Sequence, residues 1–434
     1  MKILLKNALV IDPKNKLNGY YDLLIKDAYI KSIKKNIKEN NKDTVYDLKG
    51  KIIIPGLIDM HTHLREPGYE EKETIKTGCE AAAAGGFTTI ACMPNTSPVV
   101  DNPATVEYIK SKAKNCLIKV VPIGSITKES EGKELAEIGF LASAGVCALS
   151  DDGRPVMNGE VMRRAMEYSS SFNLPIISHC EDLNLAGDGV MNEGYNSTIL
   201  GLKPIPAAAE EVMIARDIIL AELTDCQLHI AHLSTKRGVD LVADAKKRGI
   251  NISAEVTPHH LTLSDDAVRG YNPDTKVNPP LRSREDVEAL RKGLGEGIID
   301  VIATDHAPHT FEDKLGEYDY ASFGISGLET ALSLSYDKLI KNDILDWNQI
   351  VTAMTVNPAG ILGLDFKGIK QGAKADITIF DPDRKWTVEK NKLKSKGKNT
   401  PFAGSKLEGK VILTIINGNV IYNDLNGNGE LIYE

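Results

Sequence analysis

The sequence predicts an α/β fold, a (β/α)8 barrel accompanied by a small β-sandwich domain that the two ends of the chain form together. Two observations predict the barrel: apolar runs alternate with helical stretches between residues 52 and 305, and there are eight such runs. Runs of Val, Ile and Leu without polar alternation are typical of parallel strands buried on both faces. Eight strand–helix units in about 250 residues are typical of a TIM barrel.

The two chain ends have a different pattern, with short segments of alternating polarity separated by turn residues. The N-terminal strands are predicted at Lys2–Ile11, Tyr21–Lys26 and Tyr29–Lys34. Residues 373–381 and 410–422 have the same character, so we expect both ends to meet in one β domain. The predicted division is 1–51 and 362–434 for the β domain, and 52–361 for the barrel. The lysine-rich stretch Lys385–Lys398 is interpreted as a solvated loop rather than a nucleic-acid patch.

The predicted barrel strands follow one another with helices between them. In order, the strands are Ile52–Ile58, Phe87–Met93, Leu117–Ile123, Gly145–Leu149, Leu174–Ile177, Gln227–Ala231, Ile250–Val256 and Ile298–Ala303. Stretches with helical periodicity are Glu73–Ala84, Ala104–Lys114, Val161–Ser170, Ala207–Ala221 and Glu285–Gly293. Gly85 and Gly86 follow the first of these as a helix stop signal.

Composition and charge exclude several classes of protein. Of the 434 residues 42% are hydrophobic and 26% charged, which is typical of a globular enzyme-sized chain and not of a disordered or fibrous one. The net charge of −8 argues against binding to nucleic acid or to an acidic membrane surface. No apolar run approaches 18 residues, so no membrane span is expected. The six cysteines form no CxxC pair, which favours buried free thiols in a reducing cytoplasm.

Histidine and aspartate residues follow five of the eight predicted strands. They stand at the C-terminal ends of the strands, where the chemistry of a (β/α)8 barrel is located. They are His61 and His63 after the first run, Asp151 and Asp152 after the fourth, His179 after the fifth, His232 after the sixth, and Asp305 after the eighth. Any one of them alone is as well explained as a hydrogen-bonded core residue. Their convergence on one rim predicts a metal site.

The residue types indicate which metal chemistry this site supports. His61 and His63 lie two positions apart, so on an extended chain both imidazoles point to the same side and can bind one ion. Imidazole and carboxylate ligands without cysteine favour zinc or a similar divalent ion in an open catalytic site. Four histidines and two carboxylates exceed the three protein ligands of one catalytic zinc and suffice for two ions. The residues therefore predict a binuclear hydrolase, with Asp151 and Asp152 both open as the shared carboxylate.

Two longer motifs contain several of these residues, namely Asp59-Met-His61-Thr-His63-Leu-Arg65-Glu-Pro-Gly and Ala303-Thr-Asp305-His306-Ala-Pro-His309-Thr-Phe-Glu-Asp-Lys314. Further motifs are Met93-Pro-Asn95-Thr96, Asp151-Asp152-Gly153, Thr257-Pro-His-His-Leu261, Asn278-Pro-Pro-Leu281 and Asn399-Thr-Pro-Phe402. Together they resemble the dihydroorotases of the amidohydrolase superfamily, specifically the class I bacterial type. The resemblance covers nearly the whole chain in the order of that family.

The resemblance implies a ligand set for two zinc ions. His61, His63 and Asp305 would bind the first ion, His179 and His232 the second, and the aspartate directly before Gly153, which is Asp152, would bridge both. Related hydantoinases and allantoinases use a carboxylated lysine as the bridge, and no lysine stands at this strand end. The resemblance assigns no ligand role to His306.

The resemblance also implies a reaction and a substrate site. The reaction is the interconversion of N-carbamoyl-L-aspartate with L-dihydroorotate and water, in pyrimidine synthesis, with Asp305 as general base and then acid. Zinc suits ring opening because it lowers the pKa of bound water from 15.7 to about 7. Arg65 would hold the substrate carboxylate through a bidentate contact. The implied substrate contacts are His63, Arg65, Asn95, Asn278, His309, and the backbone of Phe323 and Gly324.

Two other functions remain as alternatives at this stage. One is another cyclic amidohydrolase, an allantoinase or dihydropyrimidinase, and Arg65 argues against it because dihydropyrimidine carries no carboxylate. The other is a non-catalytic scaffold related to dihydroorotase; such proteins lose metal ligands, whereas all six positions are filled here. We also expect a cytoplasmic homo-oligomer, for example a dimer, and a lid formed by residues 310–322.

Overall fold

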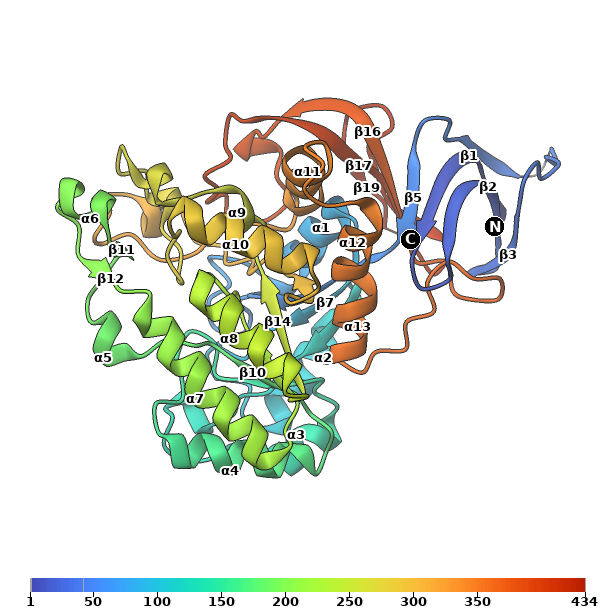
Figure 1. Ribbon diagram of the computed structural model, residues 1–434. Helices are drawn as coiled ribbons and strands as arrows, with labels where there is room; N and C mark the ends of the chain where they lie inside the picture. Colours follow the sequence, from blue (N-terminus) through green and yellow to red (C-terminus); the bar gives the residue numbers. More distant parts are fainter. Residues whose placement is uncertain (1, 42, 434) are drawn as a thin grey trace.

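The computed structural model describes residues 2–41 and 43–433 and has an α/β fold (Figure 1). Helices and short parallel strands alternate through the middle of the chain, and a β-rich part beside them contains both chain ends. Within the described residues, no helix combines the length and the apolar character that crossing a membrane requires.

A parallel strand occurs at each of the eight predicted barrel runs. Three of these strands form one sheet and five form another. Bridges between Gly124 and Leu149, and between Thr62 and His306, join the edges of the two sheets. The strands are β6 (Leu57–Thr62), β7 (Phe87–Cys92), β8 (Lys119–Pro122), β9 (Leu149–Ser150), β10 (Ile176–Ser178), β13 (Leu228–Ile230), β14 (Ile252–Val256) and β15 (Val301–Ile302).

The first predicted strand, Ile52–Ile58, is in fact two strands. Its first half is β5 (Ile52–Pro55), which pairs with strands of the β-rich part, and β6 begins only at Leu57. Gly56 separates them, and a Cβ at this position would come within 2.3 Å of the Thr88 side chain. Glycine therefore allows the chain to pass close to β7 as it moves from one sheet to the other.

The helices lie along the chain between the strands. The ends of α1 are fixed by the Thr74 hydroxyl, which accepts a hydrogen bond from the Thr77 amide, and by Gly86 in the left-handed conformation. The helices are α1 (Ile75–Gly85), α2 (Pro103–Ala113), α3 (Ile138–Ala144), α4 (Gly159–Ser170), α5 (Leu183–Ala186), α6 (Tyr195–Leu200), α7 (Ala208–Thr224), α8 (Lys236–Lys247), α9 (Pro258–Thr262), α10 (Arg284–Gly295), α11 (Ala331–Ser335), α12 (Trp347–Val351) and α13 (Asn357–Ile361). The five predicted helices are all present, with ends shifted by up to three residues.

The β-rich part is one nine-stranded sheet that unites the two ends of the chain, as the sequence predicted. β5 is the central link, because it pairs with β1 on one side and β16 on the other. The strands are β1 (Lys2–Asp12), β2 (Leu17–Lys26), β3 (Tyr29–Lys34), β4 (Thr44–Asp47), β5, β16 (Ile377–Thr387), β17 (Lys406–Ile416), β18 (Asn419–Asn423) and β19 (Glu430–Leu431). A two-residue pair, β11 (Met191–Asn192) and β12 (Pro204–Ile205), stands apart from it. The domain boundaries after residues 51 and 361 stay predictions.

The segment Lys385–Lys398 differs from the predicted solvated loop. It begins within β16 and then leaves the β sheet, and the Ser395 side chain is buried. The prediction of an exposed loop was based on the lysine side chains, and these are only some of the residues of the segment. Its backbone is held by two buried carboxylates, because Glu329 accepts hydrogen bonds from the amides of Lys394 and Ser395, and Glu73 accepts one from Lys396.

Candidate active site

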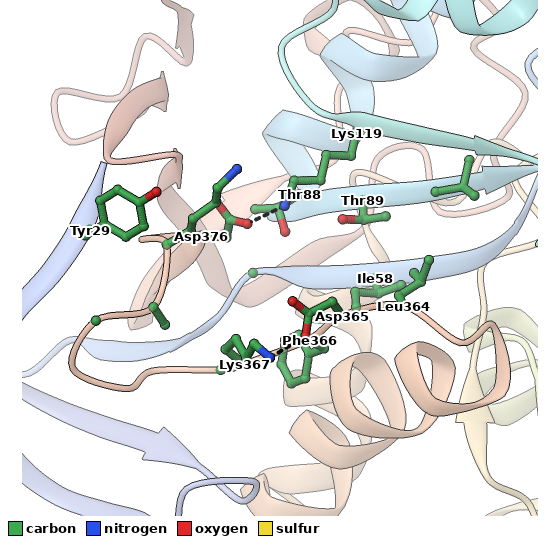
Figure 2. A pocket seen from close by; sticks show the side chains of 16 residues that line it. Tyr29, Ile58, Thr88, Thr89, Lys119, Leu364, Asp365, Phe366, Lys367 and Asp376 are labelled. Atoms are coloured by element: carbon green, nitrogen blue, oxygen red, sulfur yellow. Dashed lines mark hydrogen bonds and ion pairs between the residues drawn. The ribbon is translucent and has the colours of Figure 1, made fainter. Parts of the chain in front are cut away.

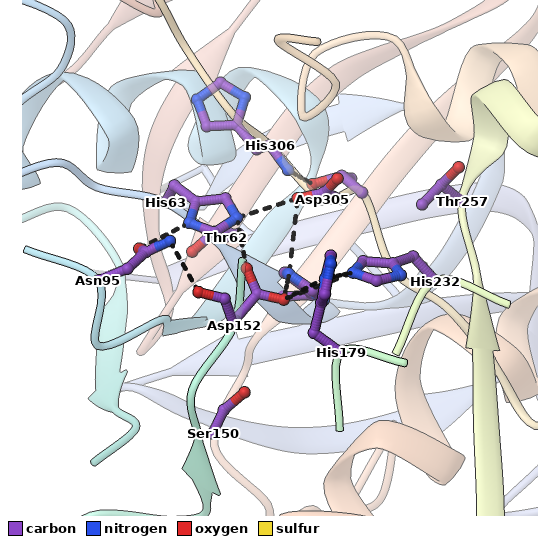
Figure 3. Close-up of polar contacts among 12 residues, drawn as sticks. Thr62, His63, Asn95, Ser150, Asp152, His179, His232, Thr257, Asp305 and His306 are labelled. Atoms are coloured by element: carbon purple, nitrogen blue, oxygen red, sulfur yellow. Dashed lines mark hydrogen bonds and ion pairs between the residues drawn. The ribbon is translucent and has the colours of Figure 1, made fainter. Parts of the chain in front are cut away.

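Six histidine and aspartate side chains meet at the C-terminal ends of five parallel strands. Figure 3 labels all of them except His61. All six are buried. They are His61 on β6, His63 just beyond it, Asp152 after β9, His179 after β10, His232 after β13 and Asp305 after β15. The structure thus brings together all six residues that the family resemblance implied as metal ligands.

Asp152 lies at the centre of this cluster and contacts the four imidazoles. Its Oδ1 is 3.4 Å from His61 Nε2, 3.6 Å from His179 Nδ1 and 3.4 Å from His232 Nε2. Its Oδ2 is 3.4 Å from His63 Nε2. One carboxylate therefore faces two separate groups of possible ligands, His61 with His63, and His179 with His232.

These spacings match those of metal ligands better than those of hydrogen bonds. His61 Nε2 and Asp152 Oδ1 are buried, and neither has a hydrogen-bond partner among the described residues. A buried polar atom without a partner is costly, which indicates that another group satisfies it. Two atoms each bound about 2.1 Å from a tetrahedral ion lie about 3.4 Å apart. The donor set, imidazole nitrogen and carboxylate oxygen, is one that zinc and similar ions accept.

The neighbouring Asp151 points away from this cluster. Its Oδ1 accepts hydrogen bonds from the amides of Ile126 and Thr127, and its Oδ2 accepts one from the Thr127 hydroxyl. Burial raises the pKa of Asp151 to about 6, against the lowering effect of these hydrogen bonds. Of the two aspartates that the sequence left open, only Asp152 faces the histidines.

A buried glutamate that the sequence analysis missed orients two of the histidines. Glu255 on β14 accepts a 2.5 Å hydrogen bond from His61 Nδ1 and a further one from the backbone amide of His232. His229 donates to its other oxygen. The carboxylate fixes the proton of His61 on Nδ1 and leaves Nε2 free to face Asp152. Burial opposes the charge of Glu255, but the adjacent imidazoles hold its pKa well below the ordinary value.

A signal for Glu255 was present in the sequence. It is the only charged residue within the apolar run Ile250–Val256. A carboxylate in a strand that is buried on both faces requires a partner. That requirement could have marked it as part of the site.

Asn95 plays the same orienting part for His63. Its Oδ1 accepts a 2.9 Å hydrogen bond from His63 Nδ1, which leaves Nε2 to face Asp152 and Asp305. Asp305 Oδ1 lies 3.0 Å from His63 Nε2. Burial raises the pKa of Asp305, but the neighbouring imidazoles lower it by more, so the pKa lies below its ordinary value. Asp305 and His232 both have positive φ, 47° and 32°, a backbone strain that is typical of functional sites.

A cavity of about 180 Å³ opens directly beside the cluster. It is lined by five of the six candidate ligands and by most of the predicted substrate contacts. The lining residues are His63, Arg65, Asn95, Asp152, Gly153, His179, His232, Asn278, Asp305, Ala307, Phe323 and Gly324. The predicted contact His309 is not among these lining residues, and its Nε2 donates to the Phe323 carbonyl at 2.8 Å.

Arg65 presents an unpaired positive charge to this cavity. Its Nε donates to the Pro308 carbonyl at 3.2 Å, and its Nη2 lies 3.3 Å from His309. It forms no ion pair with any Asp or Glu in residues 2–41 and 43–433, although it is largely buried. Burial and the charge of Arg65 lower the pKa of His309 to about 3, so this imidazole is neutral at pH 7. A guanidinium in such a place is suited to an anionic ligand.

Asn278 lines the cavity and is linked to the ligand cluster through Glu181. Its Nδ2 donates to Glu181 Oε2 at 3.1 Å, and the same oxygen is 3.4 Å from His179 Nε2. Glu181 was also missed by the sequence analysis, although it follows His179 by two positions. The carboxylate orients His179 as Glu255 orients His61.

His306 takes no part in the cluster, as the sequence analysis expected. Its Nε2 lies 3.3 Å from Glu73 Oε2, and its Nδ1 accepts a hydrogen bond from the Gly327 amide. The predicted lid, residues 310–322, is anchored by the buried Lys314. Its Nζ donates to the carbonyls of Pro273, Lys276 and Ser322. Movement of this segment stays a prediction.

A larger cavity of about 380 Å³ lies elsewhere, between the β sheet and the opposite ends of the parallel strands (Figure 2). Thr88 and Lys119 line it at the beginnings of β7 and β8. Lys119 is paired with Asp376 at 2.6 Å, and none of the possible metal-binding groups lies there. Both groups of possible metal ligands found among the described residues therefore lie at the smaller cavity.

Comparison with known proteins places the sequence among amidohydrolases. Residues 50–238 match the Dihydro-orotase-like family, and residues 207–422 match the Amidohydrolase family. A dihydroorotase of Syntrophus aciditrophicus is 54% identical over 426 residues, which are 98% of this chain and 100% of that protein. A dihydroorotase of Caldanaerobacter subterraneus subsp. tengcongensis is 54% identical over 428 residues, which are 97% of each chain.

Solved structures with the same fold come from more distant proteins. An L-hydantoinase (dihydropyrimidinase) from Arthrobacter aurescens superimposes with a TM-score of 0.87 at 24% identity, covering 100% of this chain and 97% of the other. A dihydropyrimidinase from Brevibacillus agri also gives a TM-score of 0.87, at 23% identity, covering 99% and 97%. At this level of identity the likeness concerns the fold alone.

Proposed function

The chain belongs to the dihydroorotase family and is a cyclic amide hydrolase of pyrimidine biosynthesis, and on this premise we propose how its residues carry out the reaction. The reaction interconverts N-carbamoyl-L-aspartate with L-dihydroorotate and water. The proposal rests above all on Asp152, whose carboxylate lies 3.4–3.6 Å from a ring nitrogen of each of the four histidines.

We propose that the six clustered residues hold two zinc ions. His61, His63 and Asp305 would hold one, His179 and His232 the other, and Asp152 would bridge them. When bound, the ions would lower the pKa of the attacking water and polarise the amide carbonyl. Glu255 and Asn95 then keep His61 and His63 in the tautomers that expose Nε2.

Asp305 is the proposed proton carrier. In ring opening, water adds to the amide carbonyl carbon, the C–N bond of the ring breaks, and the nitrogen gains a proton. Asp305 lines the cavity, so its carboxylate can accept the proton that the water loses and deliver it to the leaving nitrogen. Ring closure uses the same group in reverse.

Arg65 is proposed to bind the carboxylate that distinguishes dihydroorotate from dihydrouracil and hydantoin. Asn95, Asn278 and the backbone of Phe323 and Gly324 line the same cavity and are proposed to add further substrate contacts. The neutral His309 donates a hydrogen bond to the Phe323 carbonyl and so helps to position it. This arrangement favours a small ring that carries a carboxylate over an uncharged ring.

A ring-opening assay tests these assignments. We expect turnover of L-dihydroorotate, and much weaker turnover of hydantoin, allantoin and dihydrouracil. Turnover of one of these comparators in preference to L-dihydroorotate would contradict the substrate assignment. Dihydrouracil is dihydroorotate without its carboxylate, so this comparator isolates the contribution of the carboxylate.

We further infer that the eight parallel strands close into a complete barrel, that the nine-stranded sheet folds into a sandwich, and that the chain forms a homo-oligomer, for example a dimer. The two bridges between the edges of the parallel sheets support the first inference. Light scattering on the purified protein would test the third, and a mass of one chain would contradict it.

A further inference from the structure

We propose that Asn399 is a positioning residue that sets the wall of the substrate cavity, a role that rests on the function proposed above. It lies at the end of the segment that follows β16, and only 3% of its surface is exposed. The mechanism described so far does not use it.

The Asn399 side chain joins two loops that are separate in the chain. Its Nδ2 donates to the carbonyls of Ala307 at 3.0 Å and Gly324 at 2.9 Å. Its Oδ1 accepts from the backbone amide of His309 at 2.8 Å and from the Ser326 hydroxyl at 3.0 Å. The amide group therefore uses both donors and both acceptor positions, the largest number of hydrogen bonds that it can make.

Two of these partners form the cavity wall itself. Ala307 and Gly324 both line the cavity, and each is fixed through the carbonyl that Asn399 binds. Asn399 also holds the backbone of His309, whose ring supports the Phe323 carbonyl. The side chain thus reinforces the direct contact between the loop after β15 and the loop at 323–326, in which the Ala307 amide donates to the Ile325 carbonyl at 2.9 Å. No other described side chain makes hydrogen bonds to both Ala307 and Gly324.

The segment that presents Asn399 is itself fixed in the protein. The Ser395 hydroxyl donates to Glu73 Oε2 at 2.6 Å. Gly397 packs so closely that a Cβ there would come within 2.5 Å of the Pro308 side chain and 2.7 Å of the His309 amide. The Pro308 carbonyl also accepts a hydrogen bond from Arg65 Nε. Pro308 therefore links the packing around Gly397 to the residue that is proposed to bind the substrate carboxylate.

The position of Asn399 predicts a specific kinetic effect. It acts on the part of the cavity that holds the substrate carboxylate, and it does not contact any of the six proposed metal ligands. Misplacing this wall should weaken substrate binding while leaving the metal centre intact. A displacement of about 1 Å in a substrate-positioning element can cost about 100-fold.

The substitution Asn399→Asp tests this most directly, because it keeps the size and the acceptor oxygen but places an oxygen opposite two carbonyls. We expect the KM for L-dihydroorotate to rise about 10- to 100-fold, with kcat changed less than about threefold and zinc content unchanged. Asn196→Asp is the matched control. Asn196 is also buried and donates to Asp265 and Asp266, far from the cavity lining, so its substitution should leave KM unchanged.

A second variant covers the case in which Asn399→Asp does not fold. Gly397→Ala pushes on Pro308 and His309 without altering Asn399, and it should also raise KM more than kcat. A KM within twofold of the wild type in a folded Asn399→Asp enzyme, or in Gly397→Ala if the former is insoluble, would overturn the positioning role. Failure of the proposed function is a distinct result, because the wild-type chain itself would then not turn over L-dihydroorotate.

Discussion

Replacing Arg65 by alanine should destroy the preference for a carboxylate-bearing substrate. The guanidinium is largely buried, faces the cavity and has no carboxylate partner among the described residues. A bidentate contact consists of two charge-assisted hydrogen bonds, each worth about 1.5–3 kcal/mol. Taking the lower value for each bond, about 3 kcal/mol is lost, which corresponds to a decrease of about 150-fold in kcat/KM.

The assay compares two substrates on three enzymes. For L-dihydroorotate, Arg65→Ala should lower kcat/KM about 150-fold, mainly through KM, while Arg65→Lys should lose roughly 10-fold because it keeps the charge but not the fork. For dihydrouracil, which has no carboxylate, both variants should match the wild type. An unchanged KM for L-dihydroorotate in Arg65→Ala would refute this reasoning, as would an equal loss on both substrates.

Three other substitutions have defined outcomes. Asp305→Asn should abolish turnover while the protein stays folded, and near-normal turnover would refute its role as proton carrier. Glu255→Gln should weaken zinc binding about 10- to 100-fold in competition with a chromophoric chelator, because His61 loses its fixed tautomer, and an equal affinity would count against that role. Burial lowers the pKa of Lys314 to about 7 from its ordinary 10.5, so the unfolded chain binds more protons between these values. The free energy of unfolding should therefore rise with pH there, by at most about 1.4 kcal/mol per unit from this group, and Lys314→Met should remove that slope in denaturant titrations at pH 7–10. If the free energy of unfolding rose equally with pH in the wild type and in Lys314→Met, the assignment of this slope to Lys314 would be contradicted.

Much of the fold could be predicted because hydrophobic periodicity is a local signal. Strands and helices lie at the predicted runs, and the polar residues after those runs converge as the barrel hypothesis required. The division of Ile52–Ile58 could not be predicted in this way. Both halves are equally apolar, and what separates them is the close approach of Gly56 to Thr88, a contact between distant segments.

Site residues that directly follow a strand could be predicted from the sequence. Residues that orient another site residue were harder to predict. Asp151 and Asp152 are equivalent by position in the sequence, and Asp151 is held away from the histidines by the backbone amides of Ile126 and Thr127 and by the Thr127 hydroxyl. Glu255 was hidden within an apolar run. The role of the segment around Asn399 depends on a long-range path from β16 to the cavity, which the lysine content of that stretch concealed.

The metal content of matched variants tests the central proposal most directly. Elemental analysis should find about two zinc ions per chain in the wild type and in Asp151→Asn, whose side chain faces backbone amides. Asp152→Asn should lose most of the bound metal, since one carboxylate serves both groups of histidines. Active wild-type enzyme without a bound ion, or full metal content in Asp152→Asn, would contradict a binuclear centre built on Asp152.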